Sequence, residues 1–229
     1  MSSSRNVVVD QNLLPEIAWN YGTSLTHHFN LFKKDMTFDV DYYFTDFENQ
    51  VVVDIENPRE ISFYNLSGKS FSHSFQAEYS VSLTKQIEFK VAYKWYEIKT
   101  TYVDGLRDKP LVAKHRALTN VAYYTNFDKW KFDVTAHWFG ISRLPSTAMN
   151  LPENQLKDKS IAFTTINAQV TRAFKKFEIY VGIENLTDFK QPSPIISAQQ
   201  PFSAEFDASL IWGSVFGRMI YTGFRFRIK

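Results

Sequence analysis

The chain has 229 residues, with 26 Lys and Arg against 24 Asp and Glu and no cysteine. A chain without cysteine has no disulfide framework, no thiolate chemistry and no zinc–cysteine site, and a net charge of +2 gives no electrostatic case for nucleic acid as a partner. Aromatic residues make up 17% of the chain, and Phe and Tyr far outnumber Gly and Pro, which is unusual for a soluble domain.

The first residues, MSSSRNVVVDQN, lack the apolar segment of a signal peptide. Further along, the longest apolar runs span only a few residues, as at residues 51–53. A transmembrane helix needs roughly 18 apolar residues. The sequence therefore predicts neither a signal peptide nor a membrane-spanning helix.

Alternation of apolar and polar residues predicts β-strands along almost the whole chain. Residues 87–96, for example, place Ile87, Phe89, Val91, Tyr93 and Trp95 on one face and Glu88, Lys90 and Lys94 on the other. No segment shows a helical period. In chain order, the expected strands cover residues 16–32, 36–44, 71–83, 87–96, 115–125, 130–138, 162–170, 177–183 and 220–228. The sequence thus predicts an all-β chain of about nine strands.

The connections between these strands alternate strictly in length. Short turns are expected at residues 33–35, 84–86, 127–129 and 175–176, and long polar loops at residues 46–61, 100–114, 143–160 and 185–217. All short turns then lie at one end of the sheet and all long loops at the other. Long amphipathic strands with loops sorted in this way are typical of an antiparallel, up-and-down outer-membrane β-barrel with short periplasmic turns and long extracellular loops.

The physics of lipid links these features. Every backbone N–H and C=O must be paired inside the protein, so strands cross a bilayer only in a closed barrel whose outward face is apolar. Aromatic residues are expected at the two interfaces. One girdle lies beside the short turns and contains Phe32, Phe38, Phe89, Trp130, Phe132, Phe174 and Phe177, and the other contains Trp19, Tyr21, Tyr42, Tyr93, Trp95 and Trp138. A soluble β-sandwich or calycin-like barrel also has alternating strands, but its strands are shorter and its loops are not sorted by end.

Two motifs near the end of the chain carry a family resemblance. They are VGIENLTDFKQPSPI, which contains Asn185, Leu186, Thr187 and Asp188, and the final segment GSVFGRMIYTGFRF, which contains Gly217, Arg218, Tyr221, Gly223, Phe224 and Phe226. In this order the two motifs resemble the C-terminal end of TonB-dependent receptors of the outer membrane, and the upstream segments look like successive barrel strands of that family. The terminal Ile228–Lys229 departs from the aromatic residue that usually ends such barrels.

The resemblance implies what the whole protein does. Receptors of this class have 22 strands around a plug, so residues 1–229 correspond to the C-terminal part of the barrel, without plug or signal peptide. A receptor of this class imports a scarce substrate (siderophore-bound iron, haem, cobalamin or an oligosaccharide) across the bacterial outer membrane. Its partners are membrane lipid, the N-terminal barrel half, the plug and the TonB complex. The alternatives are a small self-contained outer-membrane barrel with a structural or adhesive role, and a soluble β binding module.

Candidate site residues follow from the long loops and their inward-facing roots. We expect substrate contacts at Tyr102, Arg107, Arg143 and Gln191. The five histidines show no spacing typical of metal ligands, and Asp39, Asp41, Glu88, Lys90 and Lys94 alternate as residues that face the lumen. The sequence therefore predicts no catalytic residue, no cofactor and no metal site, and the chain is not expected to be an enzyme.

Overall fold

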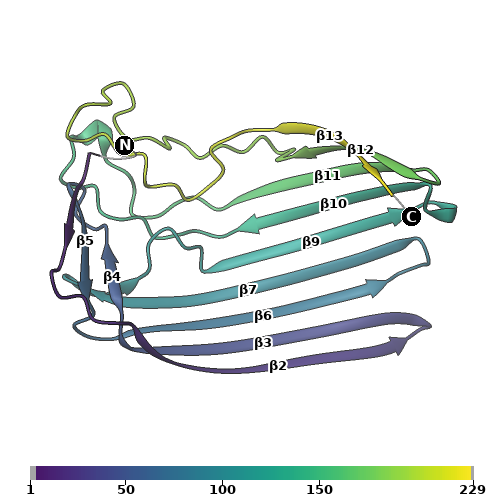
Figure 1. Ribbon diagram of the computed structural model, residues 1–229, viewed down its shortest axis with the longest axis horizontal. Helices are drawn as coiled ribbons and strands as arrows, with labels where there is room; N and C mark the ends of the chain where they lie inside the picture. The colour runs from purple at the N-terminus through teal and green to yellow at the C-terminus, as the bar shows by residue number, and fades with distance from the viewer. Residues whose placement is uncertain (1–3, 228–229) are drawn as a thin grey trace.

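A computed structural model describes residues 4–227, and its regular secondary structure is almost entirely β-strand (Figure 1). Nine long strands form one antiparallel sheet in which each strand pairs with the next. They are β2 (Ile17–Leu31), β3 (Lys34–Asn49), β6 (Ser70–Ser82), β7 (Ile87–Tyr102), β9 (His115–Tyr124), β10 (Trp130–Phe139), β11 (Phe163–Ala173), β12 (Phe177–Glu184) and β13 (Met219–Phe226). The expected all-β class and the nine strands are confirmed, although residue 228 of the expected last strand lies outside the described residues.

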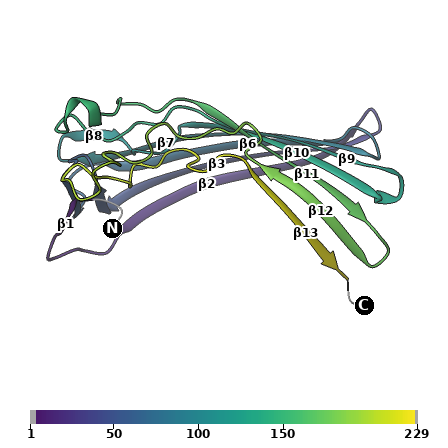
Figure 2. The same ribbon diagram turned by 90° about the horizontal axis from the view of Figure 1, so that it is seen from above.

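The sheet is open rather than closed into a barrel. Its order runs from β13 to β2, and neither edge strand pairs with the other. Seen from above, the strands near β13 are rotated away from those near β2, as the right-handed twist of a sheet demands (Figure 2). The nine strands therefore form a curved wall with two exposed edges.

The two ends of the wall differ as the loop lengths predict. Short turns connect the strands at one end, and the long connections gather at the other (Figure 1). The turn between β2 and β3 has Phe32 and Lys33 in the left-handed region, with φ of 55° and 58°. Two successive residues with positive φ are typical of a type I′ turn, which matches the twist of the paired strands.

The long-loop end also contains structure that the alternation pattern did not predict. β1 (Asn6–Val9), β4 (Val51–Asp54) and β5 (Glu60–Asn65) form a separate three-stranded sheet, and β8 (Gly105–Asp108) pairs with the end of β7. The pairing of β1 with β5 is parallel. Since β1 and β5 are separated by more than 50 residues, no local turn signal reveals their pairing.

The wall has two faces of opposite character, which we call the outer face and the inner face. In β10, the outer face carries Trp130, Phe132, Val134 and Trp138, all exposed. The inner face carries Lys131, Asp133, Thr135 and His137. Val121, Val170, Ile179 and Val181 on neighbouring strands extend the exposed apolar outer surface. No helix among residues 4–227 is both long and apolar enough to cross a membrane.

Candidate functional site

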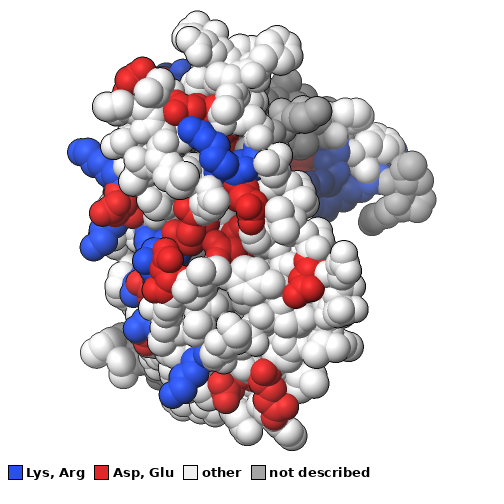
Figure 3. Space-filling model, turned by 90° about the vertical axis from the view of Figure 1, so that its left-hand side faces the viewer, with Lys and Arg blue, Asp and Glu red and all other residues white. Residues whose placement is uncertain are grey.

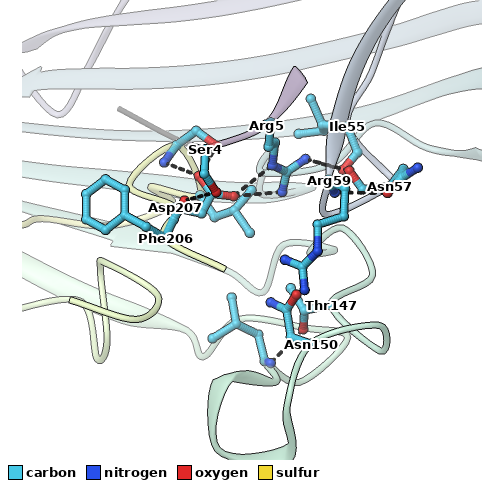
Figure 4. Close-up of polar contacts among 12 residues, drawn as sticks. Ser4, Arg5, Ile55, Asn57, Arg59, Thr147, Asn150, Phe206 and Asp207 are labelled. Atoms are coloured by element: carbon cyan, nitrogen blue, oxygen red, sulfur yellow. Dashed lines mark hydrogen bonds and ion pairs between the residues drawn. The ribbon is translucent and has the colours of Figure 1, made fainter. Parts of the chain in front are cut away.

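The long-loop end folds into a compact unit, which we call the cap. It consists of β1, residues 51–65 with β4 and β5, residues 102–114 with β8, and the loops 140–162 and 185–218. Figure 4 shows how the first described residues meet the last long loop: Ser4 donates its amide to Phe206 O at 2.9 Å, and Arg5 reaches Asp207. The cap thus joins segments about 200 residues apart.

Arg5 is the central residue of this junction. Its Nη2 and Nε both lie 2.8 Å from Asp207 Oδ2, and its Nη1 donates to the carbonyls of Ile55 and Asn57. The side chains of Arg5 and Asp207 are only 1% and 5% exposed. A buried charge is tolerated when it is paired and its remaining donors are satisfied. Arg5 therefore fixes β1, the β4–β5 turn and the loop 185–218 relative to one another.

Three of the four expected substrate-loop residues come together around Glu56. Arg143 Nη2 lies 2.5 Å from Glu56 Oε1 and its Nη1 lies 3.0 Å from Oε2, while Arg107 approaches the same carboxylate at 3.9 Å. The Arg143 guanidinium stands 5.8 Å from the ring centre of Tyr102. Burial raises the pKa of Tyr102 to about 12, so its hydroxyl stays protonated at neutral pH.

Gln191, the fourth expected residue, lies apart from this group. It is buried, its Nε2 donates to Leu210 O at 2.9 Å, and its Oε1 accepts from the amides of Trp212 and Gly213. A side-chain amide with both ends bonded to one loop substitutes for backbone hydrogen bonds that the loop cannot make itself. Gln191 thereby shapes the loop 185–218.

A second ion pair ties the loops to each other. Arg59 Nη2 lies 3.0 Å from Glu205 Oε1, and Glu205 also accepts from Asn154 Nδ2 and the Leu151 amide. These hydrogen bonds, together with Arg59, hold the pKa of Glu205 below its ordinary value. Seen end-on, acidic and basic side chains lie next to one another over the cap rather than in separate patches of one sign (Figure 3).

The cap contains an open recess with a volume of about 380 Å³. Tyr102 and Met149 contribute apolar surface to it. The polar part of its lining consists of Asp54, Glu56, Asn57, Glu60, Ser62, Asp104 and Ser146. Among residues 4–227, no group of three or more His, Asp or Glu side chains is arranged to hold a metal ion.

The first C-terminal motif forms the junction where β12 ends. Asn185 has φ of 51°, is buried, and donates through Nδ2 to Phe189 O at 2.7 Å and Phe216 O at 3.1 Å. Its Oδ1 accepts from Thr187 Oγ1 and the Phe189 amide. Asn tolerates the left-handed region and offers both donor and acceptor, which explains why this residue type stands where the strand turns into the loop.

The second motif completes the junction from the β13 side. Asp188 Oδ1 accepts from the Arg218 amide at 2.8 Å, and Arg218 Nη2 donates to Leu186 O at 2.9 Å. A Cβ at Gly217 would overlap Asp188 Oδ1 and Lys190 Cε, so a larger residue there would displace both side chains. In the strands themselves, Tyr221 stacks over Gly182. Both motifs thus hold the last two strands together.

The family model for the TonB-dependent receptor-like β-barrel matches residues 2–186. The chain belongs to this family. TonB-dependent receptor barrels are outer-membrane proteins with periplasmic turns and extracellular loops, so in this family the cap corresponds to the extracellular end and the short turns to the periplasmic end. No curated protein matches the chain in sequence.

Solved structures of TonB-dependent receptors share the fold at low sequence identity. The FrpB iron transporter from Neisseria meningitidis is 11% identical, with a TM-score of 0.63 over 96% of this chain and 32% of its own. The copper transporter OprC is 12% identical, with a TM-score of 0.61 over 91% and 30%. FpvAI, solved in complex with pyocin S2, is 15% identical, with a TM-score of 0.63 over 93% and 27%. The chain spans about a third of the length of these receptors.

The sequence did not predict the carboxylates that pair with the arginines of the cap. Glu56, Glu205 and Asp207 each lie in a long polar loop among many other polar residues. Nothing in their local spacing distinguishes a carboxylate that meets an arginine from one that is solvated. Their role emerges only when distant segments are brought together in space.

Proposed function

We propose that this chain forms part of the barrel wall and the extracellular cap of an outer-membrane active transporter that imports a scarce substrate. The match of the TonB-dependent receptor β-barrel model over residues 2–186 carries the proposal. The apolar outer face and polar inner face of the wall support it, because a barrel that conducts a polar solute needs lipid-facing apolar residues and a wet interior.

We infer that the cap residues have two different tasks. The Arg107 side chain is 39% exposed and forms longer ion pairs than Arg143 does, at 3.9 Å to Glu56 and 3.3 Å to Asp104, so it is the candidate for direct contact with substrate. Tyr102, Arg143 and Gln191 are largely buried and bonded within the cap. They contribute to substrate binding by keeping the loops in one preformed arrangement, which lowers the ordering cost of binding.

The energy for import comes from partners outside this chain. We propose that the remaining barrel strands, a plug and the TonB complex complete the transporter, and that its substrate belongs to the iron-, copper- or siderophore-type cargo named for its structural neighbours. Bacterial outer-membrane lipid surrounds the outer face.

The test is a transport assay in the source cells. A gene-deletion strain and its complemented partner are supplied with radiolabelled ferric siderophores, haem, copper or cobalamin, with and without a proton uncoupler. We expect uptake of one cargo that needs both the gene and the proton gradient, and that falls in an Arg107→Ala variant. Equal, uncoupler-insensitive uptake in both strains for every cargo would refute active import and favour a structural or adhesive barrel.

A further inference from the structure

One row of inner-face residues crosses five neighbouring strands at the same height. Gln76 on β6 stands opposite Lys94 on β7, which stands opposite Arg116 on β9. Arg116 in turn faces Phe139 on β10, and Phe139 faces Phe163 on β11. Since directly opposed residues on one face of a sheet are in side-chain contact range, two cations and two aromatic rings lie side by side on the inner wall.

Lys94 and Arg116 are like charges placed directly opposite each other, an arrangement that destabilises a sheet. Among residues 4–227 neither forms an ion pair: the nearby Glu78 is engaged by Lys90 at 2.6 Å. Asp41 lies on the same row but is separated from Lys94 by the whole β6 strand. The two cations therefore lack a carboxylate that neutralises them within the described chain.

Aromatic rings hold both cations in place. Lys94 Nζ lies 4.9 Å from the centre of the Tyr96 ring, and the Arg116 guanidinium lies 5.8 Å from Tyr96 and 5.7 Å from Phe139. Arg116 Nε is buried and has no hydrogen-bond partner among the described residues. A guanidinium fixed between two rings with an unsatisfied buried donor is a preformed but incomplete hydrogen-bonding group.

Part of this row of inner-face side chains lines a cavity. A cavity of about 360 Å³ on the inner wall is bounded by Lys94, Arg116, Phe139, Gln76 and His137. The donors available there are the guanidinium, the ammonium and the amide, whereas the Glu78 carboxylate at its margin is already paired. Space and excess positive charge coincide at one place below the cap.

We propose that this cavity is a binding site for an oxyanion, a carboxylate or phosphate group of a ligand, with Arg116 and Lys94 as the residues that bind it. The planar guanidinium matches either oxyanion with two parallel hydrogen bonds, and the Phe139 ring in the cavity lining offers apolar surface to the rest of the ligand. The inference rests on the proposed function, since the ligand is the solute that passes the cap into the lumen. It assigns that solute a negative charge.

The experiment uses the protein as it is extracted in detergent from the membranes of its source cells. Arginine-selective labelling with phenylglyoxal is followed by mass spectrometry, with no addition, with citrate or with inorganic phosphate. Arg172 is the matched control, because it packs on Trp130 at 4.7 Å on the outer face. We expect phenylglyoxal to label Arg116 when no anion is added. Increasing citrate should prevent this labelling up to saturation if the ligand group is a carboxylate, and increasing phosphate should do so if it is a phosphate. Arg172 should be labelled equally in all three conditions.

A binding titration provides the second readout. Arg116→Gln should weaken binding of the protecting anion at least tenfold, and Arg116→Lys should weaken binding less. Added salt should weaken binding further. Three results would each overturn the proposal: no phenylglyoxal labelling of Arg116, no protection of Arg116 by either anion, or protection no greater than that of Arg172. If Arg116 is protected but the protein imports no cargo, the proposed transport function is wrong and the oxyanion site stands. If cargo uptake is the same in the Arg116→Gln variant, the oxyanion site is wrong and the transport function stands.

Discussion

Replacing Glu56 by Gln should loosen the cap without disturbing the membrane-spanning strands. The substitution keeps the size of the side chain but removes the charge that receives two hydrogen bonds from Arg143, at 2.5 and 3.0 Å. The two side chains are only 9% and 19% exposed, so water screens the pair weakly. A hydrogen bond to a charged group contributes about 1.5–3 kcal/mol, and we expect the free energy of cap opening to fall by that amount.

Hydrogen exchange measures this opening locally. The Leu111 amide donates to Arg143 O at 2.9 Å and exchanges when the 109–114 segment separates from the loop 140–162. A loss of about 1.5–3 kcal/mol corresponds to roughly 10- to 150-fold faster exchange. Amides in the β11–β12 ladder, such as Val181, should keep their protection. Glu153→Gln is the matched control, since Glu153 is exposed in the same cap. Equal exchange at Leu111 in the two variants would refute the reasoning.

Four further outcomes follow from the structure. The pKa of Glu205 is lowered in the folded cap. The ionised Glu205 carboxylate therefore stabilises the cap above the pKa that Glu205 has in the unfolded chain, and this stabilisation is lost as the pH falls through its pKa in the folded cap. Faster hydrogen exchange of the Leu151 amide at acidic pH would show the resulting opening of the cap. The pKa of Tyr102 is raised to about 12 in the folded cap, so the cap should lose stability as the pH rises from about 10, the ordinary pKa of tyrosine. A tyrosinate absorbance titration in which every tyrosine ionises near its ordinary pKa would contradict this. Val134→Arg on the outer face should cost about 2–4 kcal/mol in the inserted protein, whereas Thr135→Arg on the inner face should be tolerated; equal insertion of both variants would show that the faces are misassigned. Expressed alone, the chain should aggregate or oligomerise through its edges β2 and β13, and a sharp heat-modifiable monomer band on a denaturing gel would argue against this.

The sequence predicts the wall well because lipid and water impose a strict period of two. In β7, Val91 and Lys90 point to opposite faces as the alternation requires. The short turns are local, and their position follows from where the alternation breaks. Even the segment 162–170, which alternates only weakly, falls almost wholly within the regular strand β11, since the ladders to β10 and β12 outweigh its weak pattern.

The cap could not be predicted in the same way. Arg5 and Asp207 are 202 residues apart, and the parallel β1–β5 pairing has no turn that announces it. The expected residues Tyr102, Arg107 and Arg143 were chosen for their loops, but only the folded chain shows that Glu56 brings them together. For the C-terminal motifs, the family resemblance located Asn185 and Arg218 but not their task of joining β12 to β13.

The number of strands constrains what can complete this wall. Nine antiparallel strands alternate in direction, so the first and last, β2 and β13, run the same way (Figure 1). If a second copy closed the barrel edge to edge, β13 of one copy would meet β2 of the other in a parallel seam at both junctions, and parallel pairing is the weaker kind. Closure by antiparallel pairing alone needs an odd number of additional strands whose two edges both run opposite to β2 and β13. An even-numbered barrel contains such a complement to any nine consecutive strands, so the exposed edges fit the rest of a receptor barrel better than they fit a copy of themselves.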